Sequence, residues 1–465
     1  MTADIHFGTD GWRAVIGADY TYDSLRRVAA AAGRVFAADD PGGTVIIGFD
    51  TRFQAGAFAA AAAEVIASPG LKVLVSDRYC PTPALCWSVK MDDSACGGVM
   101  LTASHNPSEY LGFKLRMSDG GASPVEFTDR VEAELLAEPP TTRGTYEVVD
   151  LMGPYLADLA SLVDGDAIHA ACLSVVVDPL FGAGQNYLAN TLSSLGVRVN
   201  EVHSWPDSNF GGLHPEPIPP WIDFAADTVR STGADAGFVT DGDADRIGAI
   251  DRHGNFVSPH RIIALMAQHL VQDKGKTGRV VKTWSTSVLV DRLARSLGLE
   301  VTTTTVGFKW IYNEMVKGDV LVGGEESGGI GIPSHVRERD GLLMALMLTE
   351  MMAQRGKGLG ELVDDMLAIT GPMEYRRVDL RLDPAVKDAF VASIPTLDPA
   401  EIAGWAVLEV LKAEGVKFLL SDDAWLLLRP SGTEPLVRVY AEAPTMGVVD
   451  DLLAAGKAMV EGASA

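Results

Sequence analysis

The chain has 465 residues, of which 47% are hydrophobic and 22% are charged. These fractions are typical of a folded globular protein and exclude a disordered chain. The formal net charge of −24 excludes nonspecific binding to nucleic acids and to anionic membrane surfaces, so an anionic substrate would need local basic groups. With roughly 100 to 200 residues per domain, the length predicts three or four domains.

The cysteines and the apolar segments indicate the compartment. Cys80, Cys86, Cys96 and Cys172 show neither C-x-x-C spacing nor an alternating disulfide framework, which indicates reduced thiols. The first residues lack the basic and apolar regions of a signal peptide, and no later apolar run is long enough to span a bilayer. We therefore expect a soluble cytoplasmic protein.

The first 142 residues alternate between helical and strand patterns. The expected elements are a helix over Tyr22–Ala38, a strand over Thr44–Asp50, a helix over Ala55–Ala67, and strands over Leu71–Val75, Gly97–Leu101 and Gly112–Leu115. This alternation predicts a mostly parallel sheet with functional loops at the strand ends. Proline and small polar residues at 138–142 predict a domain boundary.

The same pattern recurs twice and then changes. Strands are expected over 173–178, 197–202, 236–240, 279–283 and 320–323, and helices over 183–195, 259–271 and 287–297. From about Gly371, segments 375–382, 424–428 and 437–441 are typical of an antiparallel sheet. We predict three similar α/β domains with mixed, mostly parallel sheets over 1–142, 143–253 and 254–370, and an α+β domain with an antiparallel sheet over 371–465.

A serine stands where an apolar strand of the first unit ends. Ser104 lies in Thr-Ala-Ser-His-Asn-Pro at 102–107, the serine loop, shortly after Gly97–Leu101. A ligand can reach a hydroxyl at this place, although most such serines only bond the local backbone. The other loops decide between these two interpretations.

Three aspartates stand at alternate positions after another apolar strand. Asp241, Asp243 and Asp245 lie in residues 241–246, the acidic loop. An EF-hand would need glycine at position six and glutamate at position twelve, where this chain has Arg246 and Arg252. A solvated acidic turn remains the alternative. Alternating carboxylates can instead face one oxygen-preferring cation, and Mg²⁺ is the expected ion.

The charge of such a site requires basic partners. Three carboxylates and Mg²⁺ leave a charge of about −1, and a phosphoserine beside them would add about −2. Arg246 follows the carboxylates, His105 follows the serine, and Arg13 and Lys114 lie in neighbouring segments of the first unit. Each of them alone is most often an ordinary surface or core residue. Their collection at strand ends favours a site for an anion.

Residues 324–329, the Glu-Ser loop, combine carboxylates with a hydroxyl. Glu325 and Ser327 suit sugar hydroxyls, and no G-x-S-x-G nucleophile elbow surrounds the serine. Gly307 and Lys309 lie in a turn before a helix that is expected to begin near Trp310. Lys309 is either a general acid or base with a pKa lowered by burial or by other cations, or a surface lysine.

Residues 429–433, the arginine loop, have the opposite chemistry. An arginine fork, two hydroxyls and exposed amides suit a phosphate dianion. The residues concerned are Arg429, Ser431, Gly432 and Thr433, with Arg438 nearby. No G-x-x-x-x-G-K-[ST] loop is present, so nucleotide hydrolysis is not favoured.

These loops resemble those of the α-D-phosphohexomutase family, in its phosphoglucomutase/phosphomannomutase group. The similarity extends from Phe7 to Arg438, and all four loops match in kind and order. The resemblance implies four domains around a central cleft and a phosphorylated Ser104. It implies one Mg²⁺ per chain, held by the phosphoserine and by Asp241, Asp243 and Asp245. A hexose 1,6-bisphosphate would form as intermediate and activator, reorient, and return its other phosphate to the serine.

The resemblance also assigns roles to the remaining residues. Lys114, His105 and Lys309 become candidates for proton transfer, without a ranking among them. Arg13 and Arg246 would neutralise charge during phosphoryl transfer. The implied substrate-binding residues are Glu325, Ser327, Gly307, Arg429, Ser431, Gly432, Thr433 and Arg438.

The preferred sugar is expected to be glucose. The Glu-Ser loop and residues 335–341 resemble those of glucose-directed members, whereas Gly329 stands where dual glucose/mannose and glucosamine members often have histidine. The alternatives are phosphomannomutase or dual activity, a glucose 1,6-bisphosphate synthase, a phosphatase and a noncatalytic sugar-phosphate sensor. Hexose phosphates are the expected partners, and the chain is expected to be a monomer or a homodimer.

Overall fold

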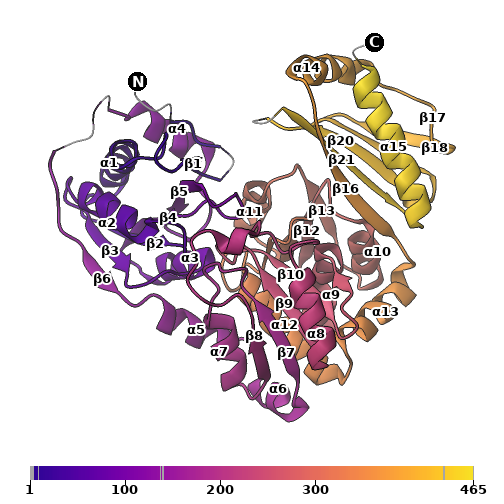
Figure 1. Ribbon diagram of the computed structural model, residues 1–465, viewed down its shortest axis with the longest axis horizontal. Coiled ribbons are helices and arrows are strands. Elements are labelled where there is room, and N and C mark those ends of the chain that lie inside the picture. Colours follow the sequence, from indigo (N-terminus) through magenta and orange to yellow (C-terminus); the bar gives the residue numbers. More distant parts are fainter. Residues whose placement is uncertain (1–4, 9, 137, 139–140, 433–434, 464–465) are drawn as a thin grey trace.

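The computed structural model describes residues 5–8, 10–136, 138, 141–432 and 435–463. Four units follow one another along the chain, and Figure 1 shows the first and the fourth on opposite sides of the second and third. Within the described ranges, no helix combines the length and the apolar character that crossing a membrane requires.

The first unit is built on a six-stranded sheet. Its strands, in spatial order, are β1 (Trp12–Val15), β5 (Tyr110–Met117), β4 (Ala95–Leu101), β2 (Thr44–Phe49), β3 (Lys72–Ser76) and β6 (Glu147–Val149). β4, β2, β3 and β6 run parallel, whereas β5 is antiparallel to β4 and β1. The helices are α1 (Tyr22–Asp39), α2 (Ala55–Ile66), α3 (Thr82–Met91) and α4 (Val125–Ala133).

The second unit has a five-stranded sheet. Its strands, in spatial order, are β11 (Phe256–Val257), β10 (Ile247–Asp251), β9 (Ala236–Thr240), β7 (Ser174–Asp178) and β8 (Arg198–Glu201). β7 is parallel to β8 and β9, and β10 is antiparallel to β9 and β11. The helices are α5 (Met152–Ser161), α6 (Gly165–Ala171), α7 (Tyr187–Ser194), the short η1 (Phe210–Gly212) and α8 (Asp223–Thr232).

The third unit has a four-stranded sheet. Its strands, in spatial order, are β13 (Val301–Thr304), β12 (Arg279–Thr283), β14 (Val320–Gly324) and β15 (Ile330–Gly331). β12 is parallel to β13 and β14, and β15 is antiparallel to β14. The helices are α9 (Pro259–Gln272), α10 (Val288–Ser296), α11 (Phe308–Lys317), α12 (Gly341–Arg355) and α13 (Leu359–Thr370).

These three sheets share one arrangement. The corresponding strands, in spatial order, are β3-β2-β4-β5, β8-β7-β9-β10 and β13-β12-β14-β15. In each sheet the third parallel strand is followed by an antiparallel strand, so the turn between them occupies the same place in every unit. The serine, acidic and Glu-Ser loops lie in these three turns.

The fourth unit is an antiparallel sheet with helices on one face. Its strands, in spatial order, are β16 (Glu374–Arg381), β21 (Leu436–Ala443), β20 (Trp425–Pro430), β19 (Val416–Leu420), β18 (Trp405–Leu411) and β17 (Glu401–Ile402). Helices α14 (Pro384–Ser393) and α15 (Met446–Gly462) share its core, and η2 (Ile394–Thr396) and η3 (Ser421–Asp423) are short turns. The arginine loop joins β20 to β21.

This architecture confirms the predicted fold class of three mixed, mostly parallel α/β units and one antiparallel α+β unit. Two details differ from the expectation. The helix expected from Ala183 begins at Tyr187, because Asn186 before it has a left-handed φ of 65°. Strand β6 lies beyond residue 142 and still pairs with β3, so the first sheet continues past the predicted boundary.

Helix α12 is buried between the sheet of the second unit on one side and helices that include α6 and α9 on the others. Every residue from Gly341 to Met352 is buried. Asp340 begins the helix by accepting the Leu343 N–H at 2.9 Å, and Gly356 ends it with a φ of 61°. The residues from Gly341 to Met352 are apolar apart from Thr349 and Glu350, and a helix of this kind is stable only where other elements cover it.

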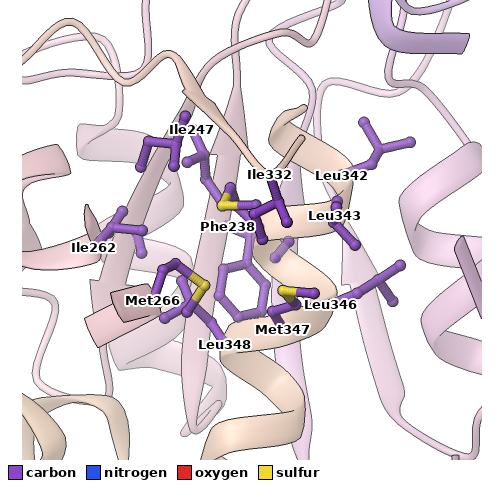
Figure 2. Packing of buried hydrophobic residues seen from close by; sticks show 14 of the residues in the cluster. Phe238, Ile247, Ile262, Met266, Ile332, Leu342, Leu343, Leu346, Met347 and Leu348 are labelled. Carbon is purple, nitrogen blue, oxygen red and sulfur yellow. The ribbon is translucent and has the colours of Figure 1, made fainter. Parts of the chain in front are cut away.

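The cover of α12 comes from the second and third units together. Figure 2 shows Leu346 and Met347 of α12 close to Phe238 of β9, with Ile262 and Met266 of α9 nearby. All five side chains belong to one buried apolar cluster. The second and third units therefore share a hydrophobic core, which fixes the positions of their loops relative to each other.

Phe238→Ala should destabilise the second and third units together. Phe238 is fully buried, and removal of its ring should lower the free energy of unfolding by about 3 to 5 kcal/mol. Because the core is shared, amide hydrogen exchange should accelerate in both β7 and β12. Phe36→Ala, in the separate core of the first unit, is the control and should leave both strands protected. Faster exchange in β7 alone would contradict a shared core.

Candidate active site

Three loops from three different units meet at the site. Ser104 Oγ in the serine loop donates a hydrogen bond to Asp241 Oδ2 in the acidic loop, at 3.0 Å. The Ile247 N–H, just after the acidic loop, donates to Gly328 O of the Glu-Ser loop at 3.0 Å. The three loops at equivalent sheet positions therefore lie side by side.

The backbone of Ser104 is held in an unusual conformation. Its φ of 53° lies in the left-handed region, which costs a residue other than glycine about 1 to 2 kcal/mol. The Thr102 hydroxyl accepts the Ser104 N–H at 2.8 Å, and Ser104 is buried. Such a conformation persists only where the surroundings fix it, and here it directs Oγ to Asp241.

The acidic loop folds so that its carboxylates converge. Ala244 has a φ of 56°, and its N–H donates to Asp241 O at 3.0 Å. One oxygen from each of Asp241, Asp243 and Asp245 lies within 4.8 Å of the others. A Cβ at Gly242 would lie 2.4 Å from Ser104 O, so only glycine lets the acidic loop approach the serine loop this closely.

The three carboxylates suit a divalent cation. Asp241, Asp243 and Asp245 are fully buried, and Asp243 Oδ1 and Asp245 Oδ1 have no hydrogen-bond partner within the described part of the chain. Buried oxygens without a donor are costly unless a cation satisfies them. A set of oxygen ligands favours a hard ion such as Mg²⁺ over softer metals. The cluster can therefore hold a metal.

The carboxylates differ in their proton affinity. Burial, together with the charges of Asp243 and Asp245, raises the pKa of Asp241 well above its ordinary value. Burial raises the pKa of Asp245 to about 6. For Asp243, Lys114 and Thr82 outweigh the effect of burial, so its pKa lies below the ordinary value. A bound cation would favour the ionised form of all three.

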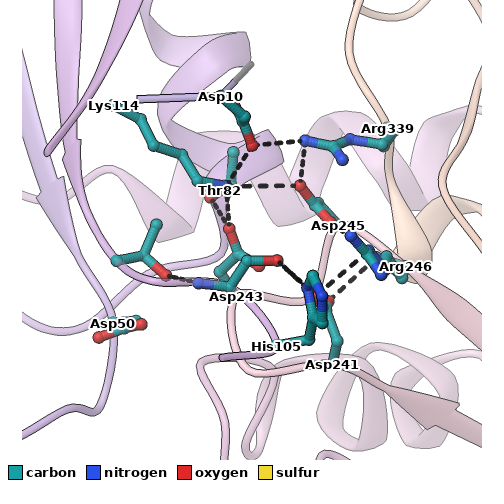
Figure 3. A network of polar contacts seen from close by, with 12 residues as sticks. Asp10, Asp50, Thr82, His105, Lys114, Asp241, Asp243, Asp245, Arg246 and Arg339 are labelled. Atoms are coloured by element: carbon teal, nitrogen blue, oxygen red, sulfur yellow. Dashed lines mark hydrogen bonds and ion pairs between the residues drawn. The ribbon is translucent and has the colours of Figure 1, made fainter. Parts of the chain in front are cut away.

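Two buried cations neutralise the acidic loop (Figure 3). Lys114 Nζ lies 2.9 Å from Asp243 Oδ2 and 2.9 Å from Asp10 Oδ2. Arg339 Nη2 lies 2.7 Å from Asp245 Oδ2 and 3.1 Å from Asp10 Oδ2. Burial lowers the pKa of Lys114, but Asp10 and Asp243 outweigh it and raise the pKa. In this state Lys114 is a fixed cation and not a base.

The two arginines predicted to neutralise charge, Arg13 of the first unit and Arg246 of the second, both lie at the site. Arg246 Nε lies 3.9 Å from a carboxylate oxygen of Asp241 and 3.9 Å from one of Asp245. This Nε has no hydrogen-bond partner in the ranges that the structure describes, so it is available to an anion. Arg13 Nη1 donates to Asn106 Oδ1 at 2.6 Å, which places Arg13 against the serine loop.

His105 lies beside the serine hydroxyl but is uncharged. Its Nδ1 is 3.4 Å from Ser104 Oγ, and its ring stacks on that of His214 with centroids 6.0 Å apart. Burial, and then Arg246 and Arg13, lower the pKa of His105 well below its ordinary value. The imidazole is neutral at pH 7, so it can exchange a proton with Oγ but adds no positive charge.

The Glu-Ser loop brings two predicted sugar-binding positions together. Glu325 Oε1 accepts the Gly307 N–H at 3.0 Å. Burial raises the pKa of Glu325 to about 7, because the charged carboxylate is poorly solvated there. Ser327 lies partly exposed in the same loop.

The arginine loop is connected to this region through a carboxylate. Arg429 and Arg438 stand directly opposite each other in the β20–β21 pair, so their side chains share one face of the sheet. Arg429 Nε lies 3.5 Å from Glu414 Oε2, and the same oxygen accepts the Val306 N–H at 2.8 Å. Glu414 therefore links the arginine loop to the residue that precedes Gly307.

The turn of the arginine loop is partly described. The Ser431 N–H donates to Leu436 O at 2.9 Å, which starts the turn from β20 into β21. Gly432 has open space where a Cβ would stand. Thr433, a predicted phosphate ligand, lies outside the described residues.

Among the residues that the structure describes, Lys309 makes no hydrogen bond or ion pair with the serine loop. Helix α11 begins at Phe308, so Lys309 lies in its first turn and not in the preceding turn. Its Nζ lies 5.0 Å from the centre of the Trp310 ring. Lys309 also lines a cavity of about 20 Å³ together with Asp10 and Arg116. Its role in proton transfer stays a prediction.

Three side chains at the site were not predicted. Asp10 lies three residues before the predicted Arg13, and Arg339 lies within residues 335–341, but their ion pair crosses between units. Thr82, at the start of α3, donates from Oγ1 to Asp243 Oδ2 at 2.6 Å. Nothing in the sequence around Thr82 indicates this contact, since its partner is 161 residues away.

Four domain models of one family match the chain in order. Their descriptions are phosphoglucomutase/phosphomannomutase α/β/α domain I at residues 4–141, domain II at 153–254, domain III at 258–369, and the C-terminal domain at 385–455. A phosphoglucomutase/phosphomannomutase of Thermococcus kodakarensis is 32% identical over 462 residues, which cover 98% of each chain. The chain belongs to the phosphoglucomutase/phosphomannomutase family. It is an α-D-phosphohexomutase, and thus an enzyme that moves a phosphoryl group on a hexose phosphate.

Similar members of this phosphohexomutase family are named for different sugars. A phosphoglucosamine mutase of Carboxydothermus hydrogenoformans is 31% identical, and the match covers 96% of this chain and 98% of that one. A solved structure from Thermus thermophilus, described as a candidate phosphomannomutase, has a TM-score of 0.90 and 38% identity and covers 99% of this chain and 100% of its own. The similarity therefore establishes the reaction class and leaves the sugar open.

Glu325→Gln should change how stability depends on pH. The pKa of Glu325 is raised from 4.5 to about 7, so between these pH values the folded state holds a proton that the unfolded state has lost. Stability therefore falls as pH rises through this window, and the neutral amide removes this loss. Relative to wild type, the variant should gain about 1 to 3 kcal/mol between pH 4.5 and pH 8. Urea unfolding at both pH values tests this, and an identical pH dependence in the two proteins would refute it.

Proposed function

We propose that this phosphohexomutase interconverts hexose 1-phosphate and hexose 6-phosphate, with glucose as the preferred sugar, through a phosphoserine at Ser104. The observation that supports it most is that Ser104 Oγ lies 3.0 Å from Asp241, at a cluster of three buried carboxylates. A serine there is badly placed to attack a carbonyl, because the developing oxyanion would meet negative charge. It is well placed to hold a phosphate that shares a cation with the carboxylates.

Ser104 would act as a covalent phosphate carrier. A hexose hydroxyl oxygen attacks the phosphorus on Ser104, the bond between phosphorus and Oγ breaks, and a hexose 1,6-bisphosphate results. The hydroxyl gives up one proton and Oγ takes one up. After the bisphosphate reorients, its other phosphoryl group passes to Oγ and the isomeric monophosphate leaves. His105, neutral and 3.4 Å from Oγ, would move this proton once Asp241, which lies 3.0 Å from Oγ, is occupied by the metal.

The surrounding charges suit this transfer. When bound by Asp241, Asp243, Asp245 and the phosphoserine, one Mg²⁺ would neutralise charge on the transferring group. Arg246 faces the same carboxylates with an unsatisfied N–H, and Arg13 lies against the serine loop. Lys114 would hold the acidic loop in place as a fixed cation.

The arginine loop would bind the phosphate that is not being transferred. Two opposed arginines on one sheet face provide a doubly charged surface, and Ser431, Gly432 and Thr433 add hydroxyls and amides. One such binding surface serves both orientations of a bisphosphate, because its two phosphates are chemically alike. Glu414 would release Arg429 to the incoming phosphate.

The Glu-Ser loop supports glucose as the preferred sugar. The loop has glycine at position 329, and a Cβ there would lie 2.3 Å from Arg339 Cδ, so a histidine would have to displace the Arg339 side chain. The sugar would then meet Glu325 and Ser327 without a neighbouring imidazole. We expect kcat/KM to be highest for glucose 1-phosphate among the glucose, mannose and glucosamine 1-phosphates, with mannose second. A preference for glucosamine would overturn this assignment and leave the reaction class intact.

Ser104→Ala should abolish turnover without loss of fold. Intact mass of the wild-type protein after incubation with glucose 1,6-bisphosphate should increase by one phosphate, whereas the variant should not change. Turnover of glucose 1-phosphate should fall at least about a thousandfold, since a covalent step is lost. Unchanged turnover in the variant would contradict the proposal. Release of inorganic phosphate would favour a phosphatase, and accumulation of bisphosphate would favour a synthase.

Asp243→Asn should act through the metal. The amide keeps the volume of the side chain but removes one negative charge, so the affinity for Mg²⁺ should fall by about tenfold or more. Activity should be lost at low Mg²⁺ and partly return at high Mg²⁺, while the thermal unfolding temperature changes little. Asp251→Asn, a buried carboxylate at the far end of β10, is the matched control and should keep the wild-type Mg²⁺ dependence. Full activity of Asp243→Asn at low Mg²⁺ would contradict the assignment of Asp243 as a ligand of the metal.

A further inference from the structure

A single buried arginine binds the backbone of the serine loop and of the residue that begins β5. Arg52 follows β2, and its side chain is completely buried. Its guanidinium donates four hydrogen bonds to carbonyl oxygens of residues 104, 106, 107 and 110, at 2.7, 2.7, 2.7 and 3.0 Å. The serine loop thus closes around one guanidinium group.

Arg52 is itself fixed from both sides. Asp50 Oδ2 accepts from Arg52 Nε at 3.1 Å, and Asp50 Oδ1 accepts the Arg52 N–H at 3.0 Å. Phe210, from the second unit, lies with its ring centre 4.8 Å from Arg52 Cζ. With Nε on Asp50 and both terminal nitrogens on the loop, each nitrogen of the guanidinium has a partner. A planar group with donors at fixed angles can impose a geometry that a flexible ammonium cannot.

The serine loop needs such an anchor because Ser104 is strained. A φ of 53° is unfavourable for serine, and the Thr102 hydroxyl satisfies only the Ser104 N–H. The Ser104 carbonyl, on the other side of the strained residue, is held by Arg52 Nη2. Without that bond a buried carbonyl would lose its partner, and the peptide would be free to relax toward a normal φ.

We propose that Arg52 is a positioning residue for phosphoryl transfer, which holds Ser104 in the left-handed conformation that points Oγ at the acidic loop. This inference rests on the proposed function, because it assigns Arg52 a part in the chemistry of Ser104. The side-chain hydrogen bonds of Arg52 go to Asp50 and to backbone carbonyls of residues 104–110, so it would act through the serine loop. Its loss should slow transfer to and from Ser104 and leave the binding of hexose phosphate nearly unchanged.

Arg52→Lys is the test, because the ammonium keeps the charge but cannot satisfy four carbonyls together with Asp50. The unphosphorylated enzyme is mixed with glucose 1,6-bisphosphate, and Ser104 phosphorylation is followed by quenched-flow mass spectrometry. In that step Ser104 Oγ attacks one phosphorus, the bond to the hexose oxygen breaks, and the proton of Oγ passes to that oxygen. The rate should fall about a hundredfold, as expected for a reacting group misplaced by about 1 Å.

Arg279→Lys is the matched control. Arg279 in the third unit also donates four hydrogen bonds, to Thr302 Oγ1, Glu314 Oε2, Glu314 O and Gly318 O. It is remote from the serine loop in the fold, so its replacement should lower the melting temperature and leave the rate of phosphorylation within about twofold of wild type. The KM for glucose 1-phosphate should stay within about threefold in both variants, so that a fall in kcat alone identifies positioning.

Each outcome decides something different. If wild-type Ser104 is not phosphorylated by the bisphosphate, the proposed function fails before Arg52 is tested. If wild type is phosphorylated and Arg52→Lys reacts at the same rate, the role of Arg52 is refuted. Should Arg52→Lys not fold, Asp50→Asn, which weakens the hold on Arg52 Nε, should still show a slower rate at unchanged KM, and a wild-type rate in that variant would refute the role.

Discussion

Three carboxylates buried within 4.8 Å of one another are the constraint on which the rest of this structure depends. Negative charges removed from water repel one another strongly, so the fold must supply positive charge at the same place. It does so with one cation from each of the first three units, namely Lys114, Arg246 and Arg339. Because the whole chain carries a charge of −24, this local collection is also what makes the site acceptable to a hexose phosphate.

The repeated sheet order explains how residues so far apart in sequence meet. In each of the first three units one turn follows the third parallel strand. The three turns carry the Ser104 hydroxyl, the three aspartates and the carboxylate of Glu325. The core around α12 holds the second and third turns in a fixed relation. The turn of the first unit is joined to them by hydrogen bonds that include those from Ser104 to Asp241 and from Thr82 to Asp243. Phosphoryl transfer depends on such positioning more than on reactive groups.

The local sequence pattern was enough to predict the fold class and the main loops. It did not predict the hydrogen bonds and ion pairs that join residues of different units. Apolar strands that run into polar turns mark Ser104 and Asp241 directly in the sequence, because both features lie within a few residues. Arg52 and Thr82 act on partners 52 and 161 residues away, and no short pattern records such contacts. The neutral state of His105 also depends on burial and on Arg246, so the sequence alone left it among the cationic partners.

In the proposed reaction, Ser104 donates its phosphate to the sugar and receives another in return. The most direct measurement starts from enzyme labelled with ³²P on Ser104 and follows the label after a single turnover with unlabelled glucose 6-phosphate and Mg²⁺. The label should leave the protein and be recovered at position 1 of glucose 1-phosphate, while the protein remains phosphorylated with unlabelled phosphate. Label that stays on Ser104 during turnover, or that appears as inorganic phosphate, would contradict the proposed reaction.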